Sequence, residues 1–244
     1  EFLLHYQPIF DARSRRITGF EALMRWMHPD LGLVSPVQFI PMAESNGLIN
    51  LLGAWALKAA CVQIRKFEEV AGRKLYISVN VSPRQFRNDQ FLDMMDAALA
   101  LSGLDGDQLV LEITEGILMS DPEHAEALLN LISTRGVRIA IDDFGTGYSS
   151  LAYLKRFPIT SLKIDRAFIK DLPGSVKDAA ICNVVFSLAN HLNLTTIAEG
   201  VENEEQLAFL ASQGCDLIQG FYTGRPLLPH AAIEVLKSDT RINP

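Results

Sequence analysis

The chain has 244 residues, of which 48% are hydrophobic and 21% charged, with a formal net charge of −7. These values are ordinary for a soluble globular protein, and no apolar run is long enough to cross a bilayer. The negative charge argues against a nucleic-acid polymer as partner, and three scattered cysteines and five unclustered histidines exclude a disulfide framework and a thiolate or imidazole metal site.

This length suits one large domain that covers residues 1–244. The chain opens on Glu1 and enters a predicted strand at once, so we expect no signal peptide and a domain cut from a longer protein. The cysteines are expected to be buried apolar side chains in a reducing compartment.

A hairpin is predicted first, because residues 2–11 and 16–26 alternate partly between apolar and polar and are joined by a polar turn. Glu21 and Arg25 lie on one face of its second strand. Their spacing alone favours a salt bridge between them.

The rest of the chain alternates helices with short apolar strands. Residues 29–36 are predicted to be a loop, and the predicted helices cover residues 41–45, 48–70, 89–101, 122–135, 149–156, 176–192 and 204–212. The predicted strands lie at 75–81, 108–114, 137–141, within 158–164, and at 194–198 and 216–218. Such alternation predicts parallel βα units that approach the strand count of an α/β (β/α)8 barrel. An open doubly wound sheet is the alternative, but no dinucleotide-binding fingerprint follows an early strand.

Polar residues lie near or just after the carboxyl end of nearly every predicted strand. They are Asn80, Glu112, Asp142 with Asp143, Lys163 with Asp165, Glu199 with Glu202, and Gln219. In a barrel the carboxyl ends of parallel strands share the face that carries the active site. One such residue is usually a cap or a loop anchor, and Asp143 alone could cap the next helix. Acids and amides at nearly every strand end instead predict a shared site.

Oxygen ligands without Cys or His select hard cations such as Mg²⁺ or Mn²⁺. The carboxylates outnumber the needs of one ion, and two ions about 3.5–4 Å apart serve many hydrolytic enzymes. Asp142 is the expected bridge and Asp143 reaches the second ion, while Lys163 orients the attacking water or neutralises an anionic transition state. A lyase with one Mg²⁺ also uses carboxylates at strand ends, but Asn80 and the paired aspartates suit two ions better.

Several short motifs follow one another along the chain in a fixed order. They are Glu21-Ala22-Leu23 with Arg25, Ser35-Pro36, Phe39-Ile40-Pro41, Ala43-Glu44, Asn80-Val81-Ser82, Glu112-Ile113-Thr114-Glu115, Asp142-Asp143-Phe144-Gly145-Thr146-Gly147, Lys163-Ile164-Asp165, Ala198-Glu199-Gly200-Val201-Glu202 and Gln219-Gly220-Phe221. Over essentially its whole length the chain therefore resembles the EAL-domain family of cyclic di-GMP phosphodiesterases.

The resemblance implies a TIM-like barrel with its first strand antiparallel to the others, two Mg²⁺ or Mn²⁺ ions, and hydrolysis of one phosphodiester bond of cyclic di-GMP to linear pGpG. By resemblance, the first ion is bound by Glu21, Asn80, Glu112 and Asp142, and the second by Asp142, Asp143 and Glu199. Lys163 resembles the lysine that contacts the attacking water. The implied catalytic residues are Glu21, Asp142, Asp143, Lys163 and Glu199.

The resemblance also implies residues near the substrate and a loop anchor. Near the substrate it places Gln7, Leu23, Arg25, Pro36, Asp165, Glu202 and Gln219, with Arg25 directed to a phosphate oxygen. Glu115 resembles the acid that anchors the DDFG loop, which in this family links dimerisation to the metal site. Thr223 departs from the family pattern, which usually has an aromatic residue there that stacks on a guanine.

The expected partner is cyclic di-GMP as a small-molecule substrate, and a homodimer is expected. A catalytically silent cyclic di-GMP receptor of the same fold is the alternative, but such members typically lose a metal ligand or the lysine. We expect a cytoplasmic domain of a multidomain signalling protein, or one at the cytoplasmic face of the inner membrane, with membrane contact only through regions outside this chain.

Overall fold

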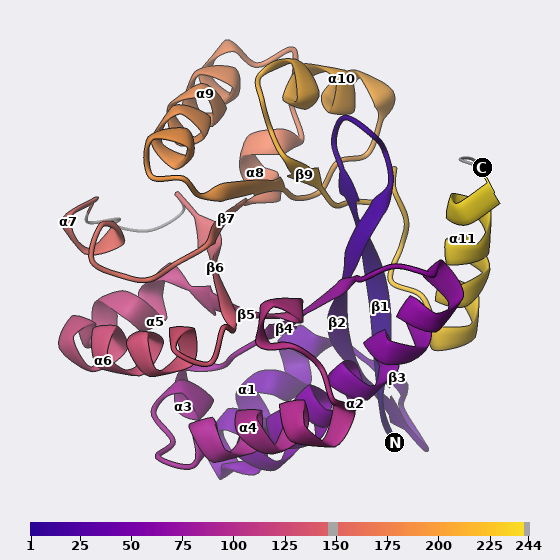
Figure 1. Ribbon diagram of the computed structural model, residues 1–244, viewed down its shortest axis with the longest axis vertical. Helices are drawn as coiled ribbons and strands as arrows, with labels where there is room; N and C mark the ends of the chain where they lie inside the picture. Colours follow the sequence, from indigo (N-terminus) through magenta and orange to yellow (C-terminus); the bar gives the residue numbers. More distant parts are fainter. Residues whose placement is uncertain (146–150, 242–244) are drawn as a thin grey trace. The chain divides into compact units, whose positions relative to one another are not determined.

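The computed structural model describes residues 1–145 and 151–241. Its strands are β1 (Phe2–Asp11), β2 (Ile17–His28), β3 (Gly32–Val34), β4 (Tyr76–Asn80), β5 (Leu109–Thr114), β6 (Arg138–Phe144), β7 (Ser161–Ile164), β8 (Thr195–Ala198) and β9 (Leu217–Ile218) (Figure 1). The helices are α1 (Pro36–Asn46), α2 (Leu48–Ala71), α3 (Pro83–Phe86), α4 (Phe91–Ser102), η1 (Gly106–Gln108), α5 (Glu115–Ser120), α6 (Pro122–Ser133), α7 (Leu151–Leu154), α8 (Arg166–Ile169), α9 (Val176–His191), α10 (Glu204–Ser212) and α11 (Pro229–Arg241).

The strands belong to one sheet in the order β1-β9-β8-β7-β6-β5-β4-β2-β3. Because β1 also pairs with β2, the pairings close on themselves and β3 is an addition beside β2. β6 pairs parallel to β7, β7 to β8 and β8 to β9, whereas β1 pairs antiparallel to β9. The predicted barrel class, with an antiparallel first strand, is confirmed.

Two compact units can be distinguished within the chain. The first contains residues 1–7, 20–111 and 226–244, and the second contains residues 8–19 and 112–225. The boundary passes through β1, β2 and β5, so these strands contribute residues to both units.

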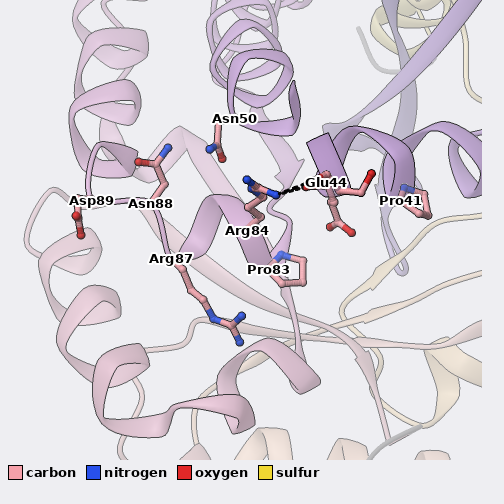
Figure 2. Close-up of a pocket in the computed structure, with 9 residues that line it drawn as sticks. Pro41, Glu44, Asn50, Pro83, Arg84, Arg87, Asn88 and Asp89 are labelled. Atoms are coloured by element: carbon pink, nitrogen blue, oxygen red, sulfur yellow. Dashed lines mark hydrogen bonds between the residues drawn. The ribbon is translucent and has the colours of Figure 1, made fainter. Parts of the chain in front are cut away.

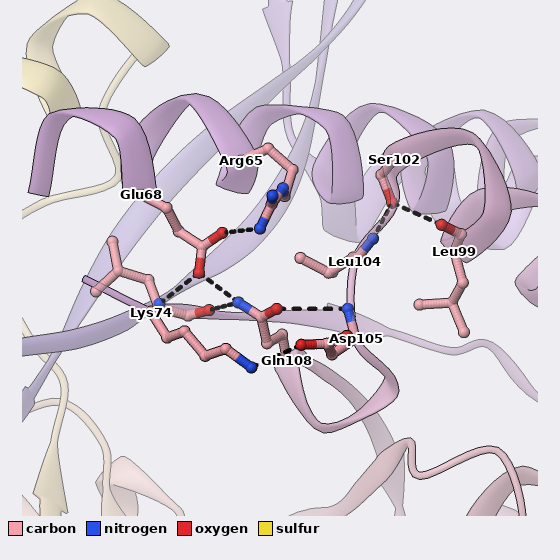
Figure 3. A network of polar contacts seen from close by, with 9 residues as sticks. Arg65, Glu68, Lys74, Leu99, Ser102, Leu104, Asp105 and Gln108 are labelled. Atoms are coloured by element: carbon pink, nitrogen blue, oxygen red, sulfur yellow. Dashed lines mark hydrogen bonds and ion pairs between the residues drawn. The ribbon is translucent and has the colours of Figure 1, made fainter. Parts of the chain in front are cut away.

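A buried polar network in the first unit connects α2 to the strand that carries Asn80. Glu68, 9% exposed near the end of α2, accepts a hydrogen bond from the backbone N–H of Leu75 at 3.0 Å and pairs with Arg65 at 2.7 Å (Figure 3). The Gln108 amide donates to Glu68 and, at 2.9 Å, to the Leu75 carbonyl. These contacts fix the chain just before β4, and β4 then ends at Asn80.

In the second unit, parallel strands are joined by helices that pack on them. α6 packs beside β6, and α9 packs against β7 and β8. Asp121 accepts from the backbone N–H of His124 at 3.2 Å and Pro122 is the first helical residue, as predicted for the start of α6. The apolar residues of β6 and β7 are buried and hold these strands in place. The acids of β6 and the lysine of β7 lie toward the carboxyl ends of the strands.

Some elements differ from the sequence-based expectations. The predicted loop at 29–36 contains β3, and α1 begins at Pro36 rather than Pro41, because Ser35 has extended dihedral angles and Pro36 suits a first helical turn. The short helices α3, α5 and α8 and the longer α11 were not predicted. Thr146, Gly147 and the beginning of the helix predicted at 149–156 lie outside the described residues.

Among the described residues, no single helix has the length and apolar composition needed to cross a membrane. α1 and α2 reach that composition only as a pair bent by 119°.

Candidate active site

The centre of the site in the second unit is Lys163, which lies in β7 and is fully buried. Its ammonium nitrogen lies 2.6 Å from a carboxylate oxygen of Glu112, 3.2 Å from one of Asp142 and 2.5 Å from one of Glu199. Three acids that lie apart in the sequence are therefore gathered around one buried cation. The structure brings these four predicted site residues together.

A bulge in β6 brings the two adjacent aspartates into the site. Ile141 pairs with Leu162 and Phe144 pairs with Ile164, so Asp142 and Asp143 together lie opposite the single residue Lys163. In a regular strand neighbouring side chains point to opposite faces, and an inserted residue changes that direction. Asp143 has φ of 53°, a left-handed conformation that few non-glycine residues adopt.

The structure therefore corrects the predicted end of this strand. β6 continues through Asp142 and Asp143 to Phe144, whereas the sequence pattern ended it at Ile141. Apolar periodicity stops at the first charged residue, although the strand resumes its pairing with β7 at Phe144, beyond the bulge. Asp143 does not cap a helix in the described residues, and its backbone N–H donates to Asp142 Oδ1 at 3.1 Å.

The acid cluster fits a hard divalent cation. One ligand oxygen from each of Asp142, Asp143 and Glu199 lies within 4.8 Å of the others. Burial first, and then the neighbouring carboxylates of Asp142 and Asp165, raises the pKa of Asp143, while Lys163 opposes this shift. A cation between the oxygens would relieve the same repulsion, and the all-oxygen donor set suits Mg²⁺ or Mn²⁺.

Three further predicted residues lie at the same strand ends of the second unit. Asp165 caps α8 by accepting from the backbone N–H of Ala167 at 2.7 Å. Glu202 pairs with Arg166 at 2.6 Å on the surface. Gln219, 3% exposed, directly follows β9, and its backbone N–H donates to the carbonyl of Ala198 at 2.9 Å.

Glu115 is the predicted anchor of the loop after β6. Its side chain is buried, and neither carboxylate oxygen has a hydrogen-bond partner among the described residues. The loop that it is expected to hold includes residues 146–150, which lie outside the described part of the chain. The anchoring role therefore stays a prediction.

In the first unit, the predicted ligands Glu21 and Asn80 are in contact. Asn80 Nδ2 donates a hydrogen bond to Glu21 Oε1 at 2.6 Å, which joins β4 to β2. Glu21 is 6% exposed. Glu21 and Asn80 thus bring a carboxylate and an amide, the oxygen donors that a hard cation prefers, to neighbouring positions.

The remaining predicted substrate residues in this unit are partly buried. They are Gln7 in β1, Leu23 and Arg25 in β2, and Pro36 at the start of α1. Arg25 donates to the carbonyl of Met24 at 2.9 Å, and the salt bridge to Glu21 that their spacing favours stays a prediction. Burial lowers the pKa of Arg25 and Glu21 raises it, which leaves the guanidinium charged.

Sequence reasoning missed a group of residues around the loop after β9. Tyr222 donates from its hydroxyl to Glu204, and Glu204 also pairs with Arg15 from the β1–β2 turn. Thr223, which replaces an expected aromatic residue, donates to the carbonyl of Gly220 at 3.0 Å. No sequence signal connects residues 15, 204 and 222, because their contact depends on the fold.

Two pockets lie away from these residues. One in the first unit, of about 780 Å³, is lined by Pro41, Glu44, Ser45, Asn50, Pro83, Arg84, Arg87, Asn88 and Asp89 (Figure 2). In it Arg84 donates to the carbonyls of Glu44 and Ser45 and so caps the end of α1. The other, in the second unit, is lined mainly by Asn, Ser, Thr and Gln side chains. Neither pocket contains a predicted metal ligand.

Comparisons with known proteins agree with this picture. Residues 1–226 match the EAL domain family. The bifunctional diguanylate cyclase/cyclic di-GMP phosphodiesterase MucR of Pseudomonas aeruginosa is 45% identical over 227 residues, which cover 93% of this chain and 33% of the relative. The cyclic di-GMP phosphodiesterase NbdA of the same organism is 43% identical over 231 residues, covering 95% and 29%. The chain thus spans about a third of the length of these relatives.

Solved structures give the same result. The MucR phosphodiesterase in complex with c-di-GMP has a TM-score of 0.90 at 45% identity, covering 94% of this chain and 93% of that one. The FimX EAL domain from Pseudomonas aeruginosa bound to c-di-GMP has a TM-score of 0.81 at 25% identity, covering 93% and 90%.

Fold and site together define an α/β barrel of mixed sheet topology with carboxylates clustered at its strand ends. The matched family covers residues 1–226, and the sequence resemblance described above is confirmed. The chain belongs to the EAL domain family.

Proposed function

We propose that this chain hydrolyses one phosphodiester bond of cyclic di-GMP to linear pGpG, with two divalent cations, Mg²⁺ or Mn²⁺. The main support is the arrangement of Glu112, Asp142 and Glu199 around Lys163, with Asp143 beside them. The names of the relatives and of the c-di-GMP complexes support the choice of substrate.

The family resemblance supports a full set of cation ligands. The proposed ligands are Glu21, Asn80, Glu112 and Asp142 for one ion and Asp142, Asp143 and Glu199 for the other. When bound, the ions supply a nucleophilic water at neutral pH and positive charge near the reacting phosphate. The water oxygen bonds to phosphorus, the bond from phosphorus to one sugar oxygen breaks, and that oxygen takes a proton.

The chain's own residues provide charge and orientation. Three carboxylates fix the ammonium group of Lys163 in place, and its positive charge can stabilise the anionic transition state. An N–H can turn to the attacking water once one of these carboxylates binds a cation. Arg25 is proposed to bind a phosphate oxygen. Leu23, Pro36, Gln7, Asp165, Glu202 and Gln219 are proposed to line the substrate or support those that do.

The decisive experiment incubates the purified chain with cyclic di-GMP and Mg²⁺ or Mn²⁺ and separates the nucleotides. We expect pGpG to accumulate, EDTA to stop the reaction, and Asp142→Asn to abolish turnover while its circular dichroism spectrum stays that of the wild type. Binding without turnover would establish the silent receptor instead, and full activity of Asp142→Asn would exclude the bridging role.

We further propose that the chain acts as a homodimer on the cytoplasmic side, as part of a longer signalling protein. Glu115 is the proposed connection between the dimer and the metal site, through the loop after β6. Sedimentation of the chain with and without cyclic di-GMP tests the dimer, and a monomer under all conditions would contradict it.

A further inference from the structure

The loop after β9, residues Gln219–Arg225, is tied by its backbone to the segment that follows β8. Val201 donates to the carbonyl of Gln219 at 3.1 Å, and Tyr222 donates back to the carbonyl of Val201 at 3.0 Å. The approach is close at Gly220, where a Cβ atom would lie 2.1 Å from the Val201 carbonyl oxygen. The segment after β8 begins with Glu199, so this loop lies next to the acid cluster.

The loop presents an exposed aromatic face. Phe221 is 50% exposed, and the guanidinium carbon of Arg225 lies 4.0 Å from the centre of its ring. An arginine on one face leaves the other face available, and a flat ring with one open face is a stacking surface for a nucleobase. The usefulness of such a surface depends on how firmly the loop is held.

A series of three interacting side chains connects the loop to α10 and to the β1–β2 turn. The Tyr222 hydroxyl donates to Glu204 at the start of α10, and Glu204 pairs with Arg15. These contacts also hold the pKa of Glu204 below its usual range, with Tyr222 the larger cause and Arg15 the smaller.

The turn that supplies Arg15 is itself rigid. Asp11 Oδ1 accepts from the backbone N–H groups of Arg13 and Ser14 at 3.1 and 2.6 Å, and from the Ser14 hydroxyl at 2.8 Å. The backbone N–H of Ala12 donates to the carbonyl of Asp216, the residue just before β9. Arg15 therefore extends from a fixed point within the second unit.

We propose that Arg15, Glu204 and Tyr222 are positioning residues that hold the loop after β9 so that Phe221 meets a base of the substrate in one orientation. The inference rests on the proposed function, and it assigns to these residues an effect on substrate affinity rather than on the chemical step. Glu204 and Arg15 are about half exposed, and exposed ion pairs add little to folding stability. Their contribution therefore lies in restricting the loop before substrate binds.

The test uses Tyr222→Phe, which removes one hydroxyl and keeps the ring, together with Glu204→Gln and the double variant. We expect KM for cyclic di-GMP to rise about 2- to 10-fold, as for a loop that must be ordered on binding, with kcat within about 2-fold of wild type. The KM of the double variant should be close to those of the single variants, because the two residues act through the same series of contacts. Arg15→Ala should lose affinity for cyclic di-GMP, whereas Arg15→Lys, which keeps the charge, should retain most of it.

Asp105→Asn is the matched control, since it breaks another exposed ion pair, Lys74–Asp105, in the first unit. It should leave KM unchanged. An unchanged KM in Tyr222→Phe, a fall in kcat alone, or fully additive effects in the double variant would overturn the proposal.

Hydrogen exchange without substrate separates this inference from the proposed function. In Tyr222→Phe the amides of residues 219–225 should exchange faster than in wild type, while those of β6 and β7 stay unchanged. Equal exchange in the two proteins refutes the positioning role even if the wild type hydrolyses cyclic di-GMP. Faster exchange in Tyr222→Phe than in a wild type that neither binds nor hydrolyses cyclic di-GMP would support the positioning role and refute the proposed function.

Discussion

Lys163 Nζ lies 2.6 Å from Glu112 Oε2, and the two side chains are 2% and 0% exposed. A pair so deeply buried is stable only while both charges are present, because either one alone would lack its compensation. Asp142 and Glu199 also contact the lysine, so negative charge exceeds positive charge around it. The site is electrostatically prepared for additional cations.

Replacing Lys163 with methionine should destabilise the protein by about 3–5 kcal/mol, because Glu112 loses its buried partner. Urea denaturation in EDTA measures the loss, and Mg²⁺ or Mn²⁺ should recover part of it by supplying positive charge. Lys74→Met removes an exposed lysine paired with Asp105 and should leave the midpoint nearly unchanged. Equal losses in the two variants would show that Lys163 does not neutralise a buried acid.

Asp143→Asn should raise the melting temperature of the metal-free protein, because it removes a like charge next to Asp142. Asparagine tolerates the left-handed backbone at this position, so the change acts through charge. Each kcal/mol shifts the melting temperature by about 2–4 °C at this size. The same variant should lose most of the rise that Mn²⁺ gives the wild type. A control at exposed Asp171 should show neither effect, and a full Mn²⁺ response in Asp143→Asn would exclude this residue as a ligand.

Gly53→Ala should cost about 1–3 kcal/mol through overpacking. A Cβ at this position in α2 would lie 1.6 Å from the Gln85 amide nitrogen, and Gln85 is buried in the capping box of α3. Gly116→Ala in α5 meets nothing within 4 Å and should be neutral or stabilising by about 0.4–1 kcal/mol. Chemical denaturation compares the two, and an equal response would mean that Gln85 moves aside freely.

The three cysteines should be inert in the folded protein. Burial raises the pKa of Cys61 and Cys215 to about 12 and that of Cys182 to about 11. Below about pH 8.5 the thiols are neutral in both folded and unfolded chains. Above it the unfolded chain ionises first, so stability falls as pH rises toward these values. Thiol reagents at pH 8 should label none of the three cysteines until urea unfolds the chain, and rapid labelling of the native protein would contradict their burial.

The sequence predicted the parts of the site that depend on local pattern. Asn80 ends β4, Glu112 lies near the end of β5 and Glu199 follows β8, as apolar runs indicate, and Lys163 lies in a buried strand. The bulge at Asp142 and Asp143 could not be predicted, because it depends on pairing with β7 rather than on periodicity. The contact of Arg15 with Glu204 and Tyr222 was likewise invisible, since it joins surface residues far apart in the chain.

The irregular step in β6 has an evolutionary consequence. A relative could keep every acid and the lysine yet straighten this strand, if substitutions in β7 restored regular pairing opposite the two aspartates. Its two aspartates would then face opposite sides of the sheet. A motif search that counts carboxylates would class such a protein as active. Distinguishing catalytically active from silent members of the family therefore requires the backbone conformation as well as the sequence.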